Sequence, residues 1–384
     1  MPEKSLREAY SDALVTTVNT LRDDHDEEEI GAAIPSYDNV RSIIQRVRTE
    51  VRQPSPTTRQ EIHLENQWTR TLTGATFLLF DDGDEDRILG FSTNDLMISL
   101  CNASTIFKDG TFRVVPKLFT QLYTLHGYYR GQMIPFACFL LPEKTEETYV
   151  RMFNLIRNHA ISLGRTFNPR AFQLDFEVAT LKALEQTFPT ADLKGCFFHF
   201  SQCHWRKVQA LGLVVHYREP EIRRFIRSAT ALALVPLDRI DDAWLEINSE
   251  SPSSEHAAYE KLEAFISYII QTWLENDSVF RRHLWNHYRN FGARTTNHVE
   301  GWHQALNRIV KKRHLNIFEM ISHLQKQEEK FRLDMMRLRM GQPPRPITKK
   351  HRILNARLIN FVQEFETGEK SLLEYVHGVA YNIQ

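Results

Sequence analysis

The chain has 384 residues, of which 42% are hydrophobic and 25% are charged, an ordinary composition for a globular protein with a large core. Its 48 basic and 48 acidic residues cancel, so the overall charge gives no sign of a nucleic-acid partner. Because the sequence lacks a run of about 18 apolar residues, we expect no membrane span. The four cysteines are too few for a disulfide scaffold and favour a reduced, intracellular protein: Cys101, Cys138, Cys196 and Cys203.

The first hundred residues divide into a helical part and the start of a sheet. Residues 1–75 are predicted to be a helical N-terminal extension, with helices at 5–21 and 36–51 and a break at Pro54 and Pro56. Residues 76–103 are predicted to be a β-hairpin and a short helix that lead into the core. The acids between the hairpin strands lack the 12-residue pattern of a calcium loop, so we interpret them as a solvated turn.

Residues 104–217 carry the clearest alternation of strands and helices, and we interpret them as the first part of an α/β core. The order is three strands, helix, strand, helix, strand and helix, which is typical of a mixed sheet with helices on its faces. The predicted strands are 104–108, 121–129, 133–141, 170–174 and 193–198, and the predicted helices are 145–164, 177–187 and 201–211.

The remaining residues are predicted to be mostly helical. Residues 218–290 are rich in aromatic side chains and form an expected helical insertion, in which helix packing explains the aromatics better than stacking on DNA bases. Residues 291–313 contain the last core helix, and 314–384 form a basic helical C-terminal region. Within 308–357 there are fourteen basic and four acidic residues, so the neutral overall charge hides a strongly positive segment.

Three acids stand at the ends of predicted elements. Asp109 follows a strand in Lys-Asp-Gly-Thr-Phe, Asp175 follows another in Leu-Asp-Phe-Glu, and Glu300 opens a helix in Asn-His-Val-Glu-Gly-Trp-His. Carboxylates delivered from separate elements are suited to hold two Mg²⁺ ions for phosphodiester chemistry. Each acid also has an ordinary interpretation, respectively as a turn residue, a helix N-cap and a first-turn glutamate that favours the helix dipole.

These motifs resemble the transposase domain of Mutator-like elements, the MULE type. Each motif is weak alone, but their order and combination are specific, and the stretch from Asp109 to about Gly212 carries most of them. The matching segments are Asp-Gly-Thr-Phe (109–112), Pro116 with Phe-Thr-Gln-Leu (119–122), Pro135 with Leu-Leu-Pro (140–142), Lys-Thr (144–145) with Thr-Tyr (148–149), Asp-Phe-Glu (175–177), Gly-Cys-Phe-Phe-His-Phe (195–200) and Asn-His-Val-Glu-Gly-Trp-His (297–303).

The resemblance implies an RNase H-like mixed sheet with an all-helical insertion and helical N- and C-terminal extensions. It also implies DDE chemistry, in which Asp109 bridges two Mg²⁺ or Mn²⁺ ions while Asp175 and Glu300 each hold one of them. DNA is the implied partner, a homo-oligomer is expected because transposases pair two DNA ends, and no membrane partner is expected.

A Cys-x-x-His unit, Cys196 and His199, lies where the family carries such a motif. Cys203 and His204 follow closely, which raises a zinc site as an alternative. The tight spacing and the neighbouring phenylalanines argue against zinc. We therefore expect Cys196, His199 and also His303 to have a structural role or to shape the active site.

Lys311, Lys312 and Arg313 begin the basic segment and are the predicted DNA contacts, because Lys and Arg neutralise backbone phosphates. They also suit a nuclear import signal, and we expect the protein in the nucleus. A solvated helix face is the alternative for each of these residues.

Active elements of this type usually carry a DNA-reading zinc module before the core, and residues 1–100 contain no cysteine. We therefore expect a transposase that is either truncated or domesticated by its host. Two alternatives are a catalytically silent, domesticated DNA-binding or regulatory protein and an RNase H-like nuclease of another purpose.

Overall fold

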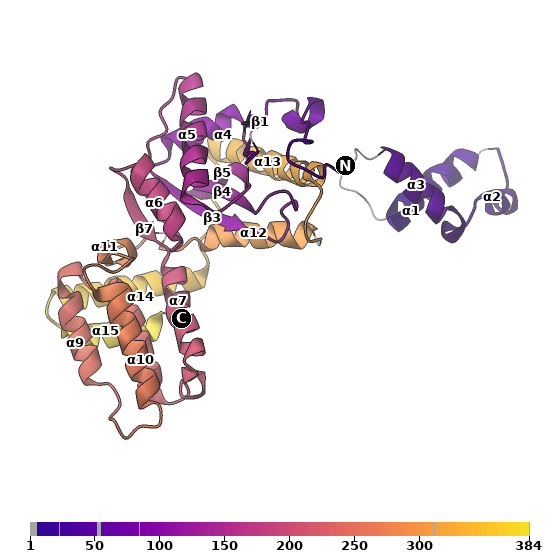
Figure 1. Cartoon of the computed structure of the whole chain (residues 1–384). Coiled ribbons are helices and arrows are strands. Elements are labelled where there is room, and N and C mark those ends of the chain that lie inside the picture. Colours follow the sequence, from indigo (N-terminus) through magenta and orange to yellow (C-terminus); the bar gives the residue numbers. More distant parts are fainter. Residues whose placement is uncertain are drawn as a thin grey trace.

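The computed structural model describes residues 6–22, 24–51, 55–83, 85–292, 294–310 and 312–383. Its N-terminal helices, α1 (Leu6–Leu21), α2 (Glu27–Ala33) and α3 (Tyr37–Val51), lie apart from the rest of the chain (Figure 1). Tyr10 joins them, because its hydroxyl donates to the Pro35 carbonyl at 2.8 Å and its ring packs edge-on against Tyr37. This group of helices therefore has its own contacts.

The centre of the molecule is a mixed sheet, in which the described residues form seven strands in the order β1-β2-β5-β4-β3-β6-β7. The neighbouring strands from β1 to β3 in this order are antiparallel. The last two strands, β6 and β7, are parallel to β3. The chain is therefore an α/β protein, and the hairpin β1–β2 belongs to the same sheet. The strands are β1 (Leu78–Asp81), β2 (Leu89–Phe91), β3 (Thr105–Thr111), β4 (Gln121–Tyr129), β5 (Gln132–Leu141), β6 (Ala171–Leu174) and β7 (Asp192–Gly195).

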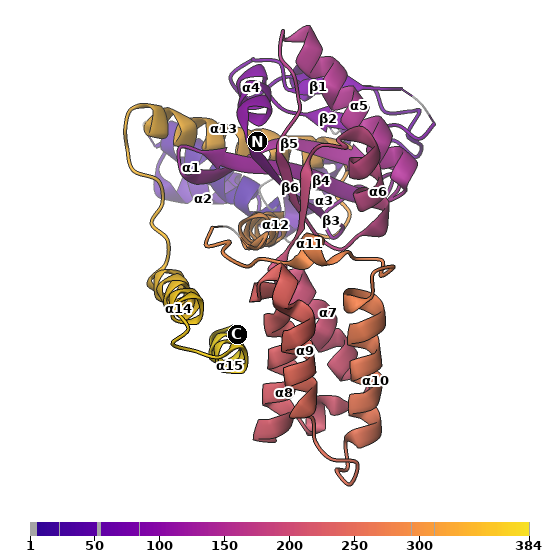
Figure 2. The same ribbon diagram turned by 90° about the vertical axis from the view of Figure 1, so that its left-hand side faces the viewer.

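Helices cover both faces of this sheet (Figure 2). On one face α5 (Glu146–Ser162) packs Tyr149 against Tyr123 of β4, next to α6 (Val178–Thr187). On the other face α12 (Asn297–Val310) packs Trp302 against His126 of β4, next to α13 (Ile317–Arg339). Because side chains alternate along a strand, β3 turns Lys108 toward α5 and Asp109 toward α12. The short η1 (Asn66–Thr69) and α4 (Asn94–Asn102) complete this part.

A second hydrophobic core lies below the sheet and is built almost entirely from helices (Figure 1). Phe200 stacks on Trp285 and meets Trp273 edge-on, and both tryptophans are nearly fully buried. These aromatic side chains therefore form the core of this region, as the sequence indicates. Its elements are α7 (Phe197–Ala210), η2 (Leu213–Val215), α8 (Pro220–Ala231), η3 (Leu232–Leu234), η4 (Leu237–Arg239), α9 (Ile240–Ser249), α10 (Tyr259–Ile269), η5 (Ile270–Leu274), α11 (Arg282–Trp285), α14 (Lys349–Glu366) and α15 (Leu372–Asn382).

The last two helices return to this second core, since α15 packs on α8 and α9. The hydroxyl of Tyr375 donates to the Leu234 carbonyl at 2.5 Å, and this hydrogen bond holds α15 against η3 in the second core. None of the helices in the described parts of the chain has the length and apolar character that crossing a membrane requires.

One predicted strand is too long. The sequence predicts a strand over 193–198, but β7 ends at Gly195, Cys196 is the N-cap of α7, and the helix begins at Phe197. The reason is the spacing of Phe200, His204 and Val208, which are four residues apart and bury one helical face in the second core. This early turn into a helix is what places Cys196 and His199 at a helix end.

We predict that Gly195→Ala destabilises the protein by about 1–3 kcal/mol, the usual cost of overpacking a core. A Cβ at Gly195 would lie 2.4 Å from Cζ of Phe176, whose ring is fixed by Phe200, Trp273 and Phe280. The measurement is the free energy of unfolding in denaturant.

Gly301→Ala is the matched control, because a Cβ there meets nothing within 4 Å on an exposed part of α12. It should stabilise the protein by about 0.5–1 kcal/mol through helix propensity. Equal effects of the two substitutions would contradict the packing described at Gly195.

Candidate active site

Two of the three predicted acids lie on or directly after neighbouring strands, Asp109 within β3 and Asp175 as the first residue after β6. β3 and β6 are parallel and pair Thr105 with Ala171 and Phe107 with Gln173. Asp109 comes two residues after Phe107, and Asp175 comes two residues after Gln173. Helix α12 contacts β3 and brings Glu300 in its first turn to the same region.

Asp109 is held by a series of hydrogen bonds that connects β3, α12 and β4. Its Oδ2 lies 3.1 Å from Nδ1 of His303, and its Oδ1 accepts from the backbone N–H of Gly110 at 2.8 Å. Nε2 of His303 lies 3.0 Å from Oγ1 of Thr124, which also meets Nε2 of His126 at 3.0 Å. Burial and the neighbouring His303 lower the pKa of His126 far below its ordinary value, so His126 is neutral at pH 7. This series of hydrogen bonds fixes the orientation of the Asp109 carboxylate.

Asp175 forms an ion pair with Lys108, whose side chain is fully buried. Burial alone would lower the pKa of Lys108, but the charges of Asp175 and Glu177 outweigh it and raise that pKa overall. Burial alone would raise the pKa of Asp175, but Lys108 outweighs it and lowers that pKa overall. Both partners are therefore charged at neutral pH, and the pair turns Asp175 toward the α5 side of the sheet.

Glu300 lies on the other side, next to His199 of α7. Its Oε1 is 3.4 Å from Nε2 of His199. Burial is the main cause that raises the pKa of Glu300; His199 acts in the opposite direction, and the negative charge of Asp109 adds to the increase. The charge of Asp109 therefore affects the pKa of Glu300, although the two side chains share no hydrogen bond among the described residues.

The three acids share one region but do not converge on one point. Among the described residues, Glu300 has a ligand atom within 4.8 Å of those of Cys196 and His199, whereas Asp109, Asp175 and Glu300 do not form such a group. Their donor chemistry nevertheless fits Mg²⁺ or Mn²⁺, which prefer carboxylate oxygens. Oε1 of Glu300 is shielded from solvent and has no hydrogen-bond partner among the described residues, which suits an oxygen that awaits a cation.

The four Cys and His side chains of residues 196–204 separate into two pairs. Cys196 and His199 face Glu300, whereas Cys203 packs on the second core and His204 is buried there, with Nδ1 3.1 Å from Oγ1 of Thr230. They therefore do not form a single four-ligand zinc site.

Cys196 and His199 shift each other's pKa. Burial raises the pKa of the Cys196 thiol, but His199 and hydrogen bonds from Thr296 outweigh burial and lower it overall. Burial lowers the pKa of His199, but Cys196, Asp175 and Glu300 outweigh burial and raise it overall.

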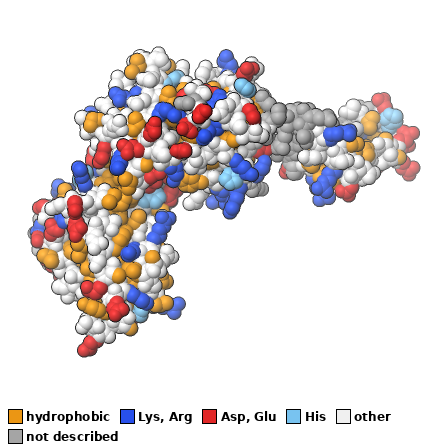
Figure 3. Space-filling view, viewed as in Figure 1, with side chains coloured by type: hydrophobic (Ala, Val, Ile, Leu, Met, Phe, Trp, Pro, Cys, Tyr) orange, Lys and Arg blue, Asp and Glu red, His pale blue; other side chains and the backbone are white. Residues whose placement is uncertain are grey.

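The predicted DNA contacts follow α12. Lys312 and Arg313 are exposed, and Lys311 lies outside the described residues. Figure 3 shows Lys and Arg side chains gathered where α12 ends. Part of the positive charge further along is paired within the chain, by Lys312 with Glu319, Arg332 with Glu329, and Arg345 with Asp334. The positive surface is therefore weaker than the sequence count indicates.

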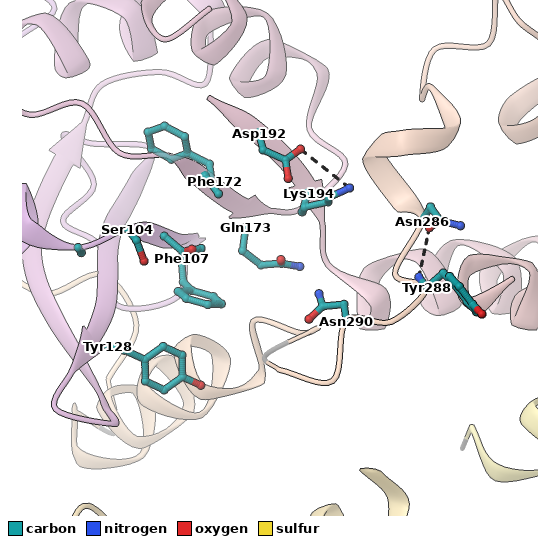
Figure 4. Close-up of a pocket in the computed structure, with 13 residues that line it drawn as sticks. Ser104, Phe107, Tyr128, Phe172, Gln173, Asp192, Lys194, Asn286, Tyr288 and Asn290 are labelled. Carbon is teal, nitrogen blue, oxygen red and sulfur yellow. Dashed lines mark hydrogen bonds and ion pairs between the residues drawn. The ribbon is translucent and has the colours of Figure 1, made fainter. Parts of the chain in front are cut away.

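A cavity of about 460 Å³ opens beside this region, between β3, β6, β7 and the loop before α12 (Figure 4). Phe107, Tyr128 and Gln173 line it, but none of the three predicted acids does. The Gln173 amide already donates to the carbonyls of Gly195 and Arg294, at 3.1 and 3.2 Å. The cavity thus lies next to the acids without being built around them.

Sequence reasoning missed Lys108, Thr124 and His126, which position the acids. The available signal was their location, because each is a polar residue inside a predicted apolar strand and is almost fully buried in the structure.

Residues 105–203 match the family model of the MULE transposase domain. This part of the chain is a MULE transposase domain. No curated protein matches the chain. The matched residues run from the start of β3 into α7, so Asp109, Asp175, Cys196 and His199 all lie within the match, while Glu300 and His303 lie beyond it.

We predict that Lys108→Met lowers the free energy of unfolding at pH 7 by roughly 2 kcal/mol. That is less than the roughly 3–5 kcal/mol typical when one partner of a fully buried pair is removed, because 30% of the Asp175 side chain is exposed and water can solvate its unpaired charge. The pKa of Asp175 is lowered by folding, so the pair stabilises the protein above the ordinary Asp value of 3.8 and less as the pH falls below it. The difference between the two proteins should therefore shrink in acid.

Arg239→Met is the control, since its pair with Asp242 is exposed and should contribute below about 1 kcal/mol. Unfolding curves at several pH values measure both effects. A pH-independent loss in Lys108→Met would show that packing, and not the charge pair, is responsible.

Proposed function

We propose that the chain is a MULE-type DDE transposase with an RNase H-like core, which cleaves and transfers DNA strands with two Mg²⁺ or Mn²⁺ ions. The observation that carries this proposal is that Asp109 lies on β3 and Asp175 directly follows the neighbouring parallel strand β6, both within the residues that match the MULE transposase domain, with Glu300 supplied from α12. The strand order supports the RNase H-like core, because β3 lies between antiparallel β4 and parallel β6.

When bound, the two ions activate the attacking water or 3′-hydroxyl and stabilise the leaving oxygen. The chain's own residues hold the carboxylates ready for them. Gly110 and His303 fix both oxygens of Asp109, and Lys108 keeps Asp175 ionised despite its burial. Glu300 needs a higher pH than an ordinary glutamate to ionise, so metal binding through it should weaken in acid.

DNA binding is the second part of the proposal. Lys311, Lys312 and Arg313 follow the helix that carries Glu300, and the exposed side chains of Lys312 and Arg313 suit contacts with backbone phosphates near a scissile bond. We also propose a nuclear location and an oligomer that pairs two DNA ends, both from the transposase assignment.

One observation favours a second candidate function, a catalytically silent DNA-binding or regulatory protein. Asp175 forms an ion pair with Lys108. Among the described residues, the carboxylate oxygens of Asp109, Asp175 and Glu300 do not form a group within 4.8 Å of one another. If that arrangement persists when DNA and metal are present, the site cannot hold two ions.

We predict that the purified chain nicks and joins a short labelled duplex with Mn²⁺, and that Asp109→Asn lowers the rate at least about a hundredfold, equivalent to about 2.7 kcal/mol of transition-state stabilisation. Asp192→Asn is the matched control, because Asp192 is an exposed acid of the same sheet. DNA affinity should be similar in all three proteins.

Equal rates for the parent and Asp109→Asn would contradict the site. DNA binding without metal-dependent cleavage in the parent would favour the silent protein. Scission without joining would favour an RNase H-like nuclease of another purpose.

A further inference from the structure

The Cys-x-x-His unit has no role in the chemistry proposed above, although the structure gives it a built environment. Cys196 is the N-cap of α7, and His199 follows in the first turn. Glu300 reaches the same point from the first turn of α12. One ligand atom of each of the three side chains lies within 4.8 Å of the other two.

We propose that Cys196, His199 and Glu300 bind a transition-metal ion of the zinc type. Zinc bonds to Cys, His and Glu are about 2.0–2.3 Å long, so tetrahedral ligand atoms lie about 3.5 Å apart. The 3.4 Å between Nε2 of His199 and Oε1 of Glu300 already meets this spacing. A shift of about 1 Å brings atoms 4.8 Å apart to the same spacing.

The surroundings of the sulfur support a metal ligand. Sγ of Cys196 accepts hydrogen bonds from the backbone N–H and the hydroxyl of Thr296, at 3.2 and 3.3 Å. Two donors on one sulfur favour the thiolate, which is the form that binds metals. Such outer contacts also orient a ligand and support its affinity.

Two further atoms lack the hydrogen bonds that buried polar groups normally make. Oε1 of Glu300 and Nδ1 of His199 are shielded from solvent, and neither has a hydrogen-bond partner among the described residues. A buried polar atom without a partner costs free energy, and a cation held by Oε1 of Glu300 and Nε2 of His199 would offset that cost at Oε1.

The donor set selects the ion. A thiolate and an imidazole favour zinc and similar ions over Mg²⁺, which prefers oxygen. Three protein ligands leave a fourth position open, as in zinc sites that keep a water or substrate. The sequence argued against zinc because it offered only closely spaced Cys and His, whereas the structure adds a ligand from about 100 residues later.

This site has a consequence for Glu300. An ion held by Cys196, His199 and Oε1 of Glu300 leaves the second carboxylate oxygen of Glu300 for the magnesium pair of the proposed function, so Glu300 would bridge the two sites. The metal site itself does not depend on the proposed function, and it can be tested in a chain that cleaves no DNA.

The test is a Co²⁺ titration of the metal-free chain of 384 residues, followed by its absorption spectrum. A thiolate bound to Co²⁺ gives a charge-transfer band that carboxylates and imidazoles do not give. We expect such a band to saturate at one Co²⁺ per chain, to disappear when Zn²⁺ is added, and to survive a large excess of Mg²⁺.

Cys196→Ser should abolish this band, and Cys203→Ser, the matched control seven residues away, should keep it. Glu300→Gln replaces a charge at a half-buried position and is the second variant, in case Cys196→Ser does not fold. Losing this ligand should weaken Co²⁺ binding at least as much as losing an outer partner does, about tenfold or more.

Absence of the band in the parent chain would overturn the proposal. So would a band that persists in folded Cys196→Ser, a band lost equally in Cys203→Ser, or an unchanged affinity in Glu300→Gln. Displacement of the band by Mg²⁺ would assign the site to a hard ion and would also contradict the proposal.

Discussion

The parallel pairing of β3 with β6 is the constraint on which the rest of the candidate site depends. It brings Asp109 of β3 close to Asp175, which directly follows β6, although 65 residues separate them in the chain. A shift of one residue in this register would turn the side chains of one strand to the other face of the sheet. Ile106 and Phe172, which face each other across this pairing, are fully buried, so a shift in register would expose apolar side chains.

The site also shows how the chain accommodates charge in a buried place. Lys108 and Asp109 are adjacent in the sequence but face opposite sides of the sheet, and each meets a partner there. Lys108 neutralises Asp175 on the α5 side, while His303, Thr124 and the Gly110 N–H hold Asp109 on the α12 side. An ion pair that stabilises the fold therefore uses one of the acids that the proposed chemistry needs. A metal ion bound at Asp175 would have to compete with Lys108 for that carboxylate.

Much of the fold was predictable from the sequence, because it rests on local patterns. The alternation of apolar strands and the helix caps at Thr93 and Thr145 predicted each strand of the sheet and the helices between them. Two things were not predictable. The end of β7 depends on the burial of one face of α7 in the second core, which distant segments build, and the return of α15 to α8 depends on contacts between residues about 150 positions apart.

The candidate site was predictable to a similar extent. The order of the motifs singled out Asp109, Asp175 and Glu300 as candidates, and the structure places them in one region, although among the described residues they do not form one ligand group. Single motifs could not show that Lys108 pairs with Asp175 or that Glu300 lies with Cys196 and His199, because these contacts join distant segments.

The central claim is that the three carboxylates together hold two hard divalent ions, and the anomalous scattering of Mn²⁺ in a crystal of the chain with a short DNA duplex tests it most directly. The account predicts two Mn²⁺ ions bridged by Asp109, with Asp175 released from Lys108 toward one ion and Glu300 bound to the other. A crystal with DNA bound, saturating Mn²⁺ and no ion on Asp109 would contradict it.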